Sequence, residues 1–218
     1  MTETRSIELE VGPQVTVFGE FTEIPQANGT VVLVHDLDAD LDSLKPFIGP
    51  LHSLLVQTLL IDMPGHGLSS GDWDSDGSAA VLAAIAAATT RTPSVGVIAV
   101  GAATRTLFGL ERPAVHAVAL VQPHLMPADL EQAESWRSVP QISMGDPCDA
   151  EAQESMEHLS RWVRAWSTRL HVHYLDEPSP HSAAWTDHMT YSAAAFVAEQ
   201  FAYRNHALPA SSLGAGHV

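Results

Sequence analysis

The sequence has 218 residues, of which 45% are hydrophobic, and 26 acidic residues against 10 basic ones give it a formal net charge of −16. A chain of this length can bury one substantial core, so we expect a single globular domain. The acidic excess disfavours nucleic acid as a partner, because phosphates would be repelled. The apolar runs fall well short of the roughly 20 residues that a membrane-spanning helix needs, and we expect no membrane partner.

The two ends of the sequence and its single cysteine guide expectations about location and boundaries. The first residues, MTETRSIELEVG, are polar and do not predict a signal peptide. Cys148 is the only cysteine, so no internal disulfide can form. We therefore expect a cytoplasmic protein with one domain over residues 1–206. The small, polar and glycine-rich stretch at 207–218 is expected to be a disordered tail.

The predicted elements begin with two strands of a hairpin, at 6–11 and 15–21. Further strands are expected at 30–35, 58–62, 95–100, 115–122, 141–144 and 170–175, and helices at 41–55, 78–91, 104–110, 129–136, 151–168 and 190–204. Short, continuously apolar strands between helices are typical of a parallel sheet covered on both faces. The predicted fold class is therefore α/β, with a mostly parallel sheet of about eight strands. Ligands of such sheets bind beyond the carboxyl ends of the strands.

Several segments resemble, in chain order, motifs of the α/β-hydrolase superfamily. TVVLVHDLDADLDSL is similar to the family's oxyanion loop with its flanking strand and helix, and TLLIDMPGHGLSSG matches its D-x-P-G-H-G-x-S motif. SVGVIAVGAATRTLF lies where the nucleophile elbow belongs, VPQISMGDPCD resembles the strand before the catalytic acid, and PSPHSAAWTDHMTYSAAAFVAEQF resembles the segment of the catalytic histidine. The resemblance extends to about Tyr203 and implies an α/β-hydrolase fold, with a triad in the order nucleophile, acid, histidine.

The resemblance places the triad histidine at His181, the acid at Asp149 or Asp146, and the nucleophile at Ala103. An alanine methyl group has no lone pair, so no acyl-enzyme can form at that position. A remnant dyad of His181 with either aspartate could still transfer protons without a covalent intermediate.

The nucleophile elbow departs from the family pattern. The resemblance assigns it five residues: Gly101, Ala102, Ala103, Thr104 and Arg105. The family needs small residues two positions before and after the nucleophile, and Arg105 is not small. Without a serine to present, nothing requires a strained turn, which costs on the order of 1–3 kcal/mol, so we expect the turn to have relaxed. A shift of register that brings Thr104 to the nucleophile position is the alternative.

The oxyanion loop departs as well, since it consists of His35, Asp36 and Leu37 and has an aspartate where the family has glycine. A carboxylate there works against stabilising an anion. An ion pair of Arg105 with Asp36 or Asp149 is expected to fill the old site.

The short stretch between the sixth and seventh predicted strands, 125–138, leaves no room for a cap domain. We expect a cap that is absent or reduced to one helix, and an open site unless another subunit covers it. Together these departures favour a non-catalytic binding or assembly subunit, with a protein partner or a homo-oligomer over the site and no cofactor. The alternatives are an enzyme of the hydrolase or lyase type that uses the dyad, and a receptor that keeps the ancestral pocket for a small ligand.

Two acidic segments invite other interpretations. DWDSDG begins like a calcium loop, but Ala83 stands at the twelfth position, where a bidentate carboxylate is needed. Asp76 or Ser78 is instead expected to cap a helix. The second segment, HDLDADLD, is predicted to be a solvated loop or a docking patch for a basic partner, and it holds Asp36, Asp38, Asp40 and Asp42.

Three smaller features complete the candidates. His171 and His173 share one side of a predicted strand, but two histidines do not complete a zinc site. Trp162 and Trp166 lie four residues apart on a predicted helix and are expected to face the core. Cys148 lies in the acid loop without a visible activating base, so a nucleophilic role is not expected.

Overall fold

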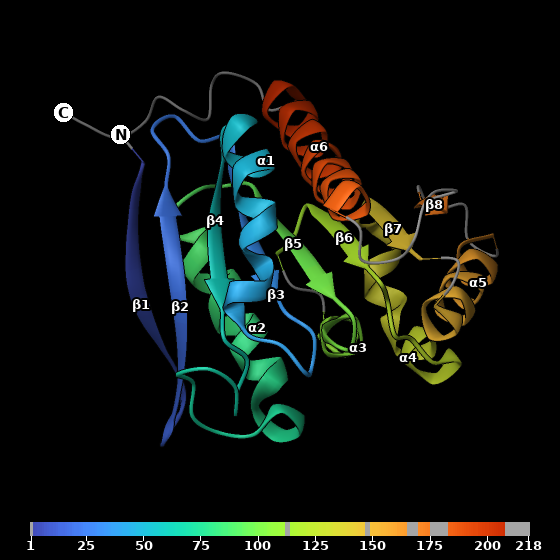
Figure 1. Ribbon diagram of the computed structural model, residues 1–218, viewed down its shortest axis with the longest axis horizontal. Helices are drawn as coiled ribbons and strands as arrows, with labels where there is room; N and C mark the ends of the chain where they lie inside the picture. Colours follow the sequence, from blue (N-terminus) through green and yellow to red (C-terminus); the bar gives the residue numbers. More distant parts are fainter. Residues whose placement is uncertain (1, 112–113, 147–148, 165–169, 175–182, 208–218) are drawn as a thin grey trace.

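The structure is a computed structural model that describes residues 2–111, 114–146, 149–164, 170–174 and 183–207. Its centre is an eight-stranded sheet in the order β1-β2-β4-β3-β5-β6-β7-β8 (Figure 1). The strands are β1 (Glu3–Gly12), β2 (Val15–Glu23), β3 (Gly29–Val34), β4 (Val56–Ile61), β5 (Val95–Val100), β6 (Ala117–Val121), β7 (Gln141–Gly145) and β8 (Leu170–Tyr174).

The sheet is parallel except at one edge. β1 and β2 form an antiparallel hairpin, and β2 pairs antiparallel with β4, whereas the strands from β4 to β8 are all parallel. The central strand β3 lies between β4 and β5, with Val32 opposite Leu59 and Val97. The carboxyl ends of the parallel strands therefore meet at one edge, the lower edge of the sheet in Figure 1. The predicted α/β class with a mostly parallel sheet is confirmed.

Helices cover both faces of the sheet. The helical elements are η1 (Leu41–Phe47), α1 (Ile48–Ser53), α2 (Trp73–Thr89), α3 (Ala103–Phe108), α4 (Pro127–Gln132), η2 (Ala133–Ser138), α5 (Ala150–Arg164) and α6 (Ala183–Ala207). One buried core lies between the sheet and η1, α1 and α6, and a second lies against α2, α3, α4, η2 and α5 (Figure 1). Consecutive residues of β3, such as Val32 and Leu33, enter opposite cores, as the two-residue period of a strand requires.

Two helices differ from the predicted ones. The helix expected at 41–55 is divided into η1 and α1, and Pro46 lies near the division, where a missing backbone N–H weakens a continuous helix. α2 begins at Trp73, five residues before the predicted start, because the Asp72 carboxylate accepts hydrogen bonds from the backbone N–H groups of the second and third helical residues. The prediction that Asp76 or Ser78 caps this helix was therefore wrong.

The connection between β6 and β7 contains only two short helices, α4 and η2. This agrees with the expected absence or reduction of a cap. In α5, the half-buried Trp162 packs against the second core beside Phe108, as predicted for it. No helix among the described residues is both long and apolar enough to cross a bilayer.

Candidate active site

The turn after β5 is where the fold places a nucleophile, and a glycine stands on it. β5 ends at Val100, and Gly101 has a left-handed φ of +56°. Ala102 already has helical angles, and α3 begins at Ala103. The family's nucleophile stands on the sharp turn between strand and helix, so in this chain the position belongs to Gly101. The assignment of that position to Ala103 was wrong, because Ala103 is fully buried in the core.

Small residues flank this turn in the pattern that the elbow requires. Two positions from Gly101 on either side are Ala99 and Ala103, and neither is exposed. Arg105 lies beyond this window and does not violate the pattern. The turn keeps its left-handed backbone, which a glycine adopts without the strain that a side chain would bring. We expected the nucleophile turn to have relaxed. The turn is kept, and the glycine removes the backbone strain that a side chain would cause there.

Both backbone amides of an oxyanion hole are present, and a carboxylate of the chain itself occupies them. The family builds this hole from the N–H of the residue after the nucleophile and an N–H of the loop after β3. Here those residues are Ala102 and Leu37, whose N–H groups donate to the same oxygen, Asp36 Oδ1, over 2.8 and 2.7 Å. The oxyanion loop departs from the family pattern, as expected. Both backbone N–H groups are kept, and the Asp36 carboxylate accepts a hydrogen bond from each of them.

The same carboxylate lies where a side chain of the turn residue would begin. A Cβ atom built on Gly101 would lie 2.1 Å from Asp36 Cγ and 2.1 to 2.2 Å from its two oxygens, much closer than any real contact. A serine at position 101 and the observed position of Asp36 therefore exclude each other. The glycine and the aspartate form one arrangement, in which the anion site is occupied and the nucleophile is missing.

His35 holds the backbone of this loop from inside the core. Its Nε2 accepts a hydrogen bond from the Met63 N–H over 2.9 Å, so the proton must reside on Nδ1, which donates to the Asp36 carbonyl oxygen over 2.6 Å. Burial lowers the pKa of His35 from its ordinary value, against a smaller opposing effect of that hydrogen bond. A fully buried, neutral imidazole with both nitrogens engaged is a structural support of the Asp36 backbone.

The D-x-P-G-H-G-x-S motif also builds structure. The buried Asp62 carboxylate accepts from the Leu41 N–H through Oδ1 and from the Leu68 N–H through Oδ2, over 2.9 and 3.1 Å. Ser69 Oγ donates to the Asp62 carbonyl oxygen and accepts from the Phe18 N–H, over 2.7 and 2.8 Å. The motif thus ties the loop after β4 to η1 and to β2.

Within the same motif, Gly67 and His66 have separate tasks. Gly67 has a φ of +52°, and a Cβ on it would lie 2.0 Å from Asp62 Oδ2, so only glycine allows the loop to close. The His66 ring contacts the carbonyl oxygens of Leu37 and Pro64. The loop after β4 therefore holds the loop after β3, which carries the Leu37 N–H.

Arg105 does not fill the old site, contrary to the expected ion pair with Asp36 or Asp149. Its Nε lies 3.3 Å from Asp129 Oδ2 at the start of α4, and the Arg105 side chain is 55% exposed. Asp129 Oδ2 also accepts from the Met126 N–H over 2.7 Å. A cavity of about 310 Å³ stays open beside the turn, lined by Leu37, Trp73, Asp74, Ser78, Ala102, Arg105, Thr106 and Asp129.

The two candidate acids have different environments. Asp149 Oδ1 accepts from the Glu151 and Ala152 N–H groups over 3.0 and 3.1 Å, so this carboxylate caps the start of α5. Asp146 is buried directly after β7, and its N–H donates to Gln122 Oε1 over 2.8 Å. The resemblance left both acids open, and the structure gives the Asp149 carboxylate a capping role while it buries Asp146. His181 and Cys148 lie outside the described residues.

Gln122 follows a strand at the carboxyl edge, where the sequence predicts ligand binding, but the sequence assigned this residue no individual role. It follows β6 with a left-handed φ of +48°, a backbone conformation that is uncommon for a residue with a side chain. Its side-chain oxygen holds the backbone of Asp146, so the strained residue fixes the start of the acid loop. Nothing in the local sequence indicates a positive φ here.

The remaining alternatives receive structural roles or fall outside the description. Thr104 is buried, and its Oγ1 donates to the Gly101 carbonyl oxygen over 2.7 Å and accepts from the His124 N–H over 3.2 Å, so its hydroxyl is engaged. No group of three or more metal-ligating side chains occurs among the residues that the structure describes. The side chains of His171 and His173 and the whole of Trp166 are outside that part of the chain.

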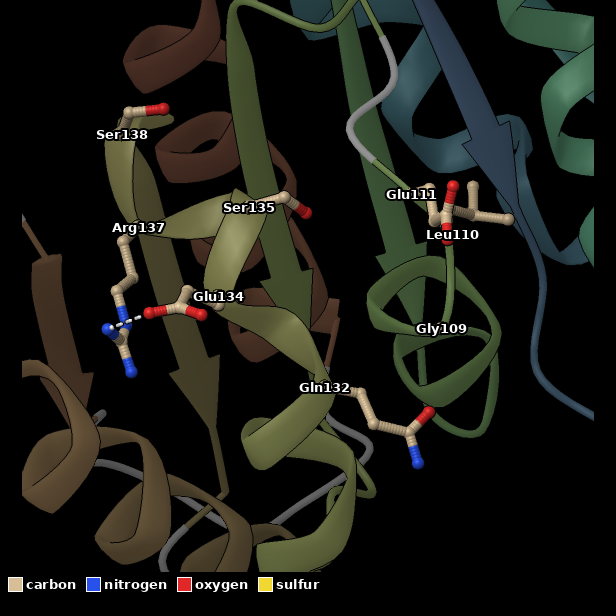
Figure 2. A pocket seen from close by; sticks show the side chains of 8 residues that line it. All are labelled: Gly109, Leu110, Glu111, Gln132, Glu134, Ser135, Arg137 and Ser138. Atoms are coloured by element: carbon tan, nitrogen blue, oxygen red, sulfur yellow. Dashed lines mark hydrogen bonds and ion pairs between the residues drawn. The ribbon is translucent and has the colours of Figure 1, made fainter.

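A larger hollow, of about 820 Å³, lies away from the elbow (Figure 2). It is bounded by the segment after α3 and by η2, and its lining residues are Gly109, Leu110, Glu111, Gln132, Glu134, Ser135, Arg137 and Ser138. Glu134 and Arg137 form an ion pair of 3.0 Å within it (Figure 2). None of the described residues of the turn, the oxyanion loop or the acid loop lines this hollow.

Comparisons with known proteins give no matching family model and no matching curated protein. Solved structures do match. An esterase of Pyrococcus furiosus has a TM-score of 0.77 and 13% identity over 91% of both chains. A dienelactone hydrolase of Anabaena variabilis has 0.67 and 16%, over 93% of this chain and 98% of its own. The esterase domain of a Rhodothermus marinus protein has 0.71 and 13%, over 90% and 99%. At such identities the likeness establishes the fold.

Proposed function

Because the chain has the α/β-hydrolase fold, we propose that it uses this scaffold for binding, without the acyl-enzyme chemistry that the fold supports elsewhere. One observation carries the proposal: Asp36 Oδ1 accepts from both oxyanion amides, beside a glycine at the nucleophile position. The protein is then a binding or assembly subunit whose partner contacts the open carboxyl edge of the sheet.

Two independent physical reasons support the loss of acyl transfer. A nucleophile needs a lone pair on a side-chain heteroatom, and Gly101 has no side chain. A tetrahedral intermediate needs the two amides for its own developing negative charge, and a carboxylate already occupies them. Removing a single oxyanion donor typically costs about 100- to 1,000-fold in rate, so losing both donors together with the nucleophile removes the mechanism.

The test is labelling of the purified protein with a fluorophosphonate probe, alongside hydrolysis of p-nitrophenyl acetate. We expect no labelled residue and no turnover above that of buffer. Stoichiometric labelling of one side chain, located by mass spectrometry, would contradict the proposal.

A second candidate function is an enzyme that uses Asp146 with His181 and forms no covalent intermediate. The observation in its favour is Gln122, because backbone strain is concentrated at functional sites and this strained residue holds the backbone of Asp146. A substrate would enter the cavity beside the turn, whose volume of about 310 Å³ lies at the lower end of the range for small-molecule sites. Replacing His181 with alanine tests this alternative: any hydrolysis that survives unchanged does not use the dyad.

A further inference from the structure

The carboxyl edge beside the turn carries exposed leucines that no described element covers. Leu37 is 45% exposed on the loop after β3, and Leu68 is 75% exposed on the loop after β4. The Asp62 carboxylate accepts from the N–H groups of Leu68 and of Leu41 at the start of η1, and the His66 ring contacts the Leu37 carbonyl oxygen. The two leucines are therefore carried by loops that contact each other at the carboxyl edge of the sheet.

The cavity beside the turn adjoins the loop that carries Leu37. Leu37 and Ala102 form its wall at the turn, and Trp73 and Asp74 form its wall at the start of α2. The Trp73 indole is fixed by a hydrogen bond of 3.1 Å to Thr106 Oγ1 and by edge contacts with the rings of His35 and His66. A rigid aromatic wall beside exposed leucines suits an apolar side chain of a partner.

The charges around these leucines are almost all negative. Asp38 and Asp40 are exposed on the loop after β3, Asp42 is exposed in the first turn of η1, and Asp72 and Asp74 are exposed at the start of α2. We call this set, together with Leu37, Leu68 and the cavity, the edge surface.

The basic residues described near the edge surface are already engaged. The Lys45 ammonium lies 2.6 Å from Asp42 Oδ1, and Arg105 pairs with Asp129. The side chains of Asp38 and Asp74 form no hydrogen bond or ion pair with another described residue. Two uncompensated carboxylates thus flank an apolar surface, and the charge that complements them is positive.

Two other possible ligands of the edge surface, a second copy of this chain and a small molecule, fit it less well. A second copy of this chain carries the same net charge of −16 and would bring like charges together, which costs free energy. A small ligand would fill the cavity and leave Leu68 exposed outside it. A segment of another protein covers both features at once.

We propose that the edge surface binds a protein segment in which lysine or arginine residues flank bulky apolar side chains. The inference rests on the proposed function, in which this edge binds a partner, and it names the chemistry of that partner. The apolar side chains contact Leu37, Leu68 and the cavity, and the basic residues pair with Asp38 and Asp74.

The experiment titrates the full chain against a fluorescein-labelled peptide, Lys-Lys-Leu-Ser-Leu-Lys-Lys, and follows fluorescence anisotropy. Control peptides carry glutamate in place of lysine or serine in place of leucine, and neither should bind. Affinity should fall as sodium chloride is raised, because the Debye length is only about 10 Å at 0.1 M salt.

Matched variants locate the binding. The pair Asp38→Asn and Asp74→Asn should weaken peptide binding by about fivefold to tenfold. The pair Glu8→Gln and Glu10→Gln removes the same two charges from exposed positions on β1 and should change binding less than about twofold. Leu37→Ser with Leu68→Ser should also weaken binding, whereas Leu82→Ser, 42% exposed on α2, should not.

Three results would overturn the inference: no binding of the lysine–leucine peptide, equal losses in the two charge-neutralising pairs, or a wild-type dimer in sedimentation that Leu68→Ser dissociates. The last result would assign the surface to a second copy. Fluorophosphonate labelling of the same wild-type preparation is measured separately. A failure of peptide binding therefore says nothing about acyl-enzyme chemistry, which the labelling result alone tests.

Discussion

The loop after β4 and the turn after β5 both contact the loop after β3. They differ in how completely each matches the corresponding motif of the α/β-hydrolase fold. The loop after β4 matches its motif residue for residue, and each side chain with a described contact there ties backbone segments together. The turn after β5 keeps the backbone shape of its motif, but it carries a glycine, and the Asp36 carboxylate accepts the N–H of Ala102. A family motif that is easy to find can thus indicate the fold without indicating the reaction. Whether acyl transfer is possible depends on a single residue in another loop, Gly101.

The comparison also explains why Asp36 can be tolerated. An isolated carboxylate beside backbone carbonyl groups would be unfavourable, but two N–H donors on one oxygen make strong, charge-assisted hydrogen bonds. Those donors exist because the oxyanion hole is part of the fold. The scaffold therefore offers an anion site that a single substitution in the neighbouring loop can fill from within.

Rebuilding the elbow is the strongest way to break this comparison. We expect the double variant Asp36→Gly with Gly101→Ser to react with a fluorophosphonate probe from an undetectable starting level, because it restores a hydroxyl on the turn and empties the amide pair. The single variant Gly101→Ser should stay unlabelled, since its Cβ would overlap the Asp36 carboxylate.

A second serine variant controls for register. Ala103→Ser places its hydroxyl in the core, because the Ala103 side chain is fully buried in α3, and it should not react. Adding His181→Ala to the rebuilt elbow should abolish labelling if that histidine serves as the base. Labelling of Ala103→Ser, or a folded but inert double variant by circular dichroism, would show that position 101 is not the nucleophile position.

The loop after β4 should respond in stability, because its residues build structure. Asp62→Ala removes a buried carboxylate that satisfies two backbone N–H groups, and we expect a loss of about 3 kcal/mol in the free energy of unfolding. Asp38→Ala, on an exposed position of the neighbouring loop, should stay within about 0.5 kcal/mol. Urea denaturation of both variants measures the contrast, and similar values for the two would remove the structural role assigned to the motif.

The central strands of the sheet could be predicted because they are buried on both faces. A strand such as Val95–Val100 then consists of consecutive apolar residues, whatever surrounds it. Helix ends were less predictable: the start of α2 depended on the Asp72 cap, and DWDSDG has several residues that could cap. Pro46 was visible in the segment 41–55, but the division of the helix near it was not foreseen.

The elbow resisted prediction for a local reason. Two candidate triplets of residues overlap here, one centred on Ala103 and one on Gly101, and the end of β5 at Val100 places Gly101 on the turn. The fit of Ala99 and Ala103 around Gly101 was a signal that could have favoured the second triplet. The contact of Asp36 with Ala102 joins positions 66 residues apart, so no local pattern reveals it. The Arg105 pairing with Asp129 likewise depends on where α4 lies.

The smallest expected effect concerns the support beneath Asp36. Burial lowers the pKa of His35 below its ordinary value of 6.5, so below about pH 6.5 the unfolded chain binds a proton that the folded chain excludes. Stability should therefore fall as the pH is lowered through this window, with a slope from one such group of at most about 1.4 kcal/mol per pH unit. His35→Asn should flatten the slope between pH 7.5 and 5.5 in urea denaturation. His52→Gln is the matched comparison, because burial also lowers the pKa of His52. Its side chain joins α1 to β4 through a hydrogen bond with Thr58 and lies away from the oxyanion loop. The contradicting result is an unchanged slope in His35→Asn together with a flattened slope in His52→Gln. That result would mean that the His35 imidazole does not stay neutral on folding. Its role as a fixed donor to the Asp36 carbonyl oxygen would then be wrong.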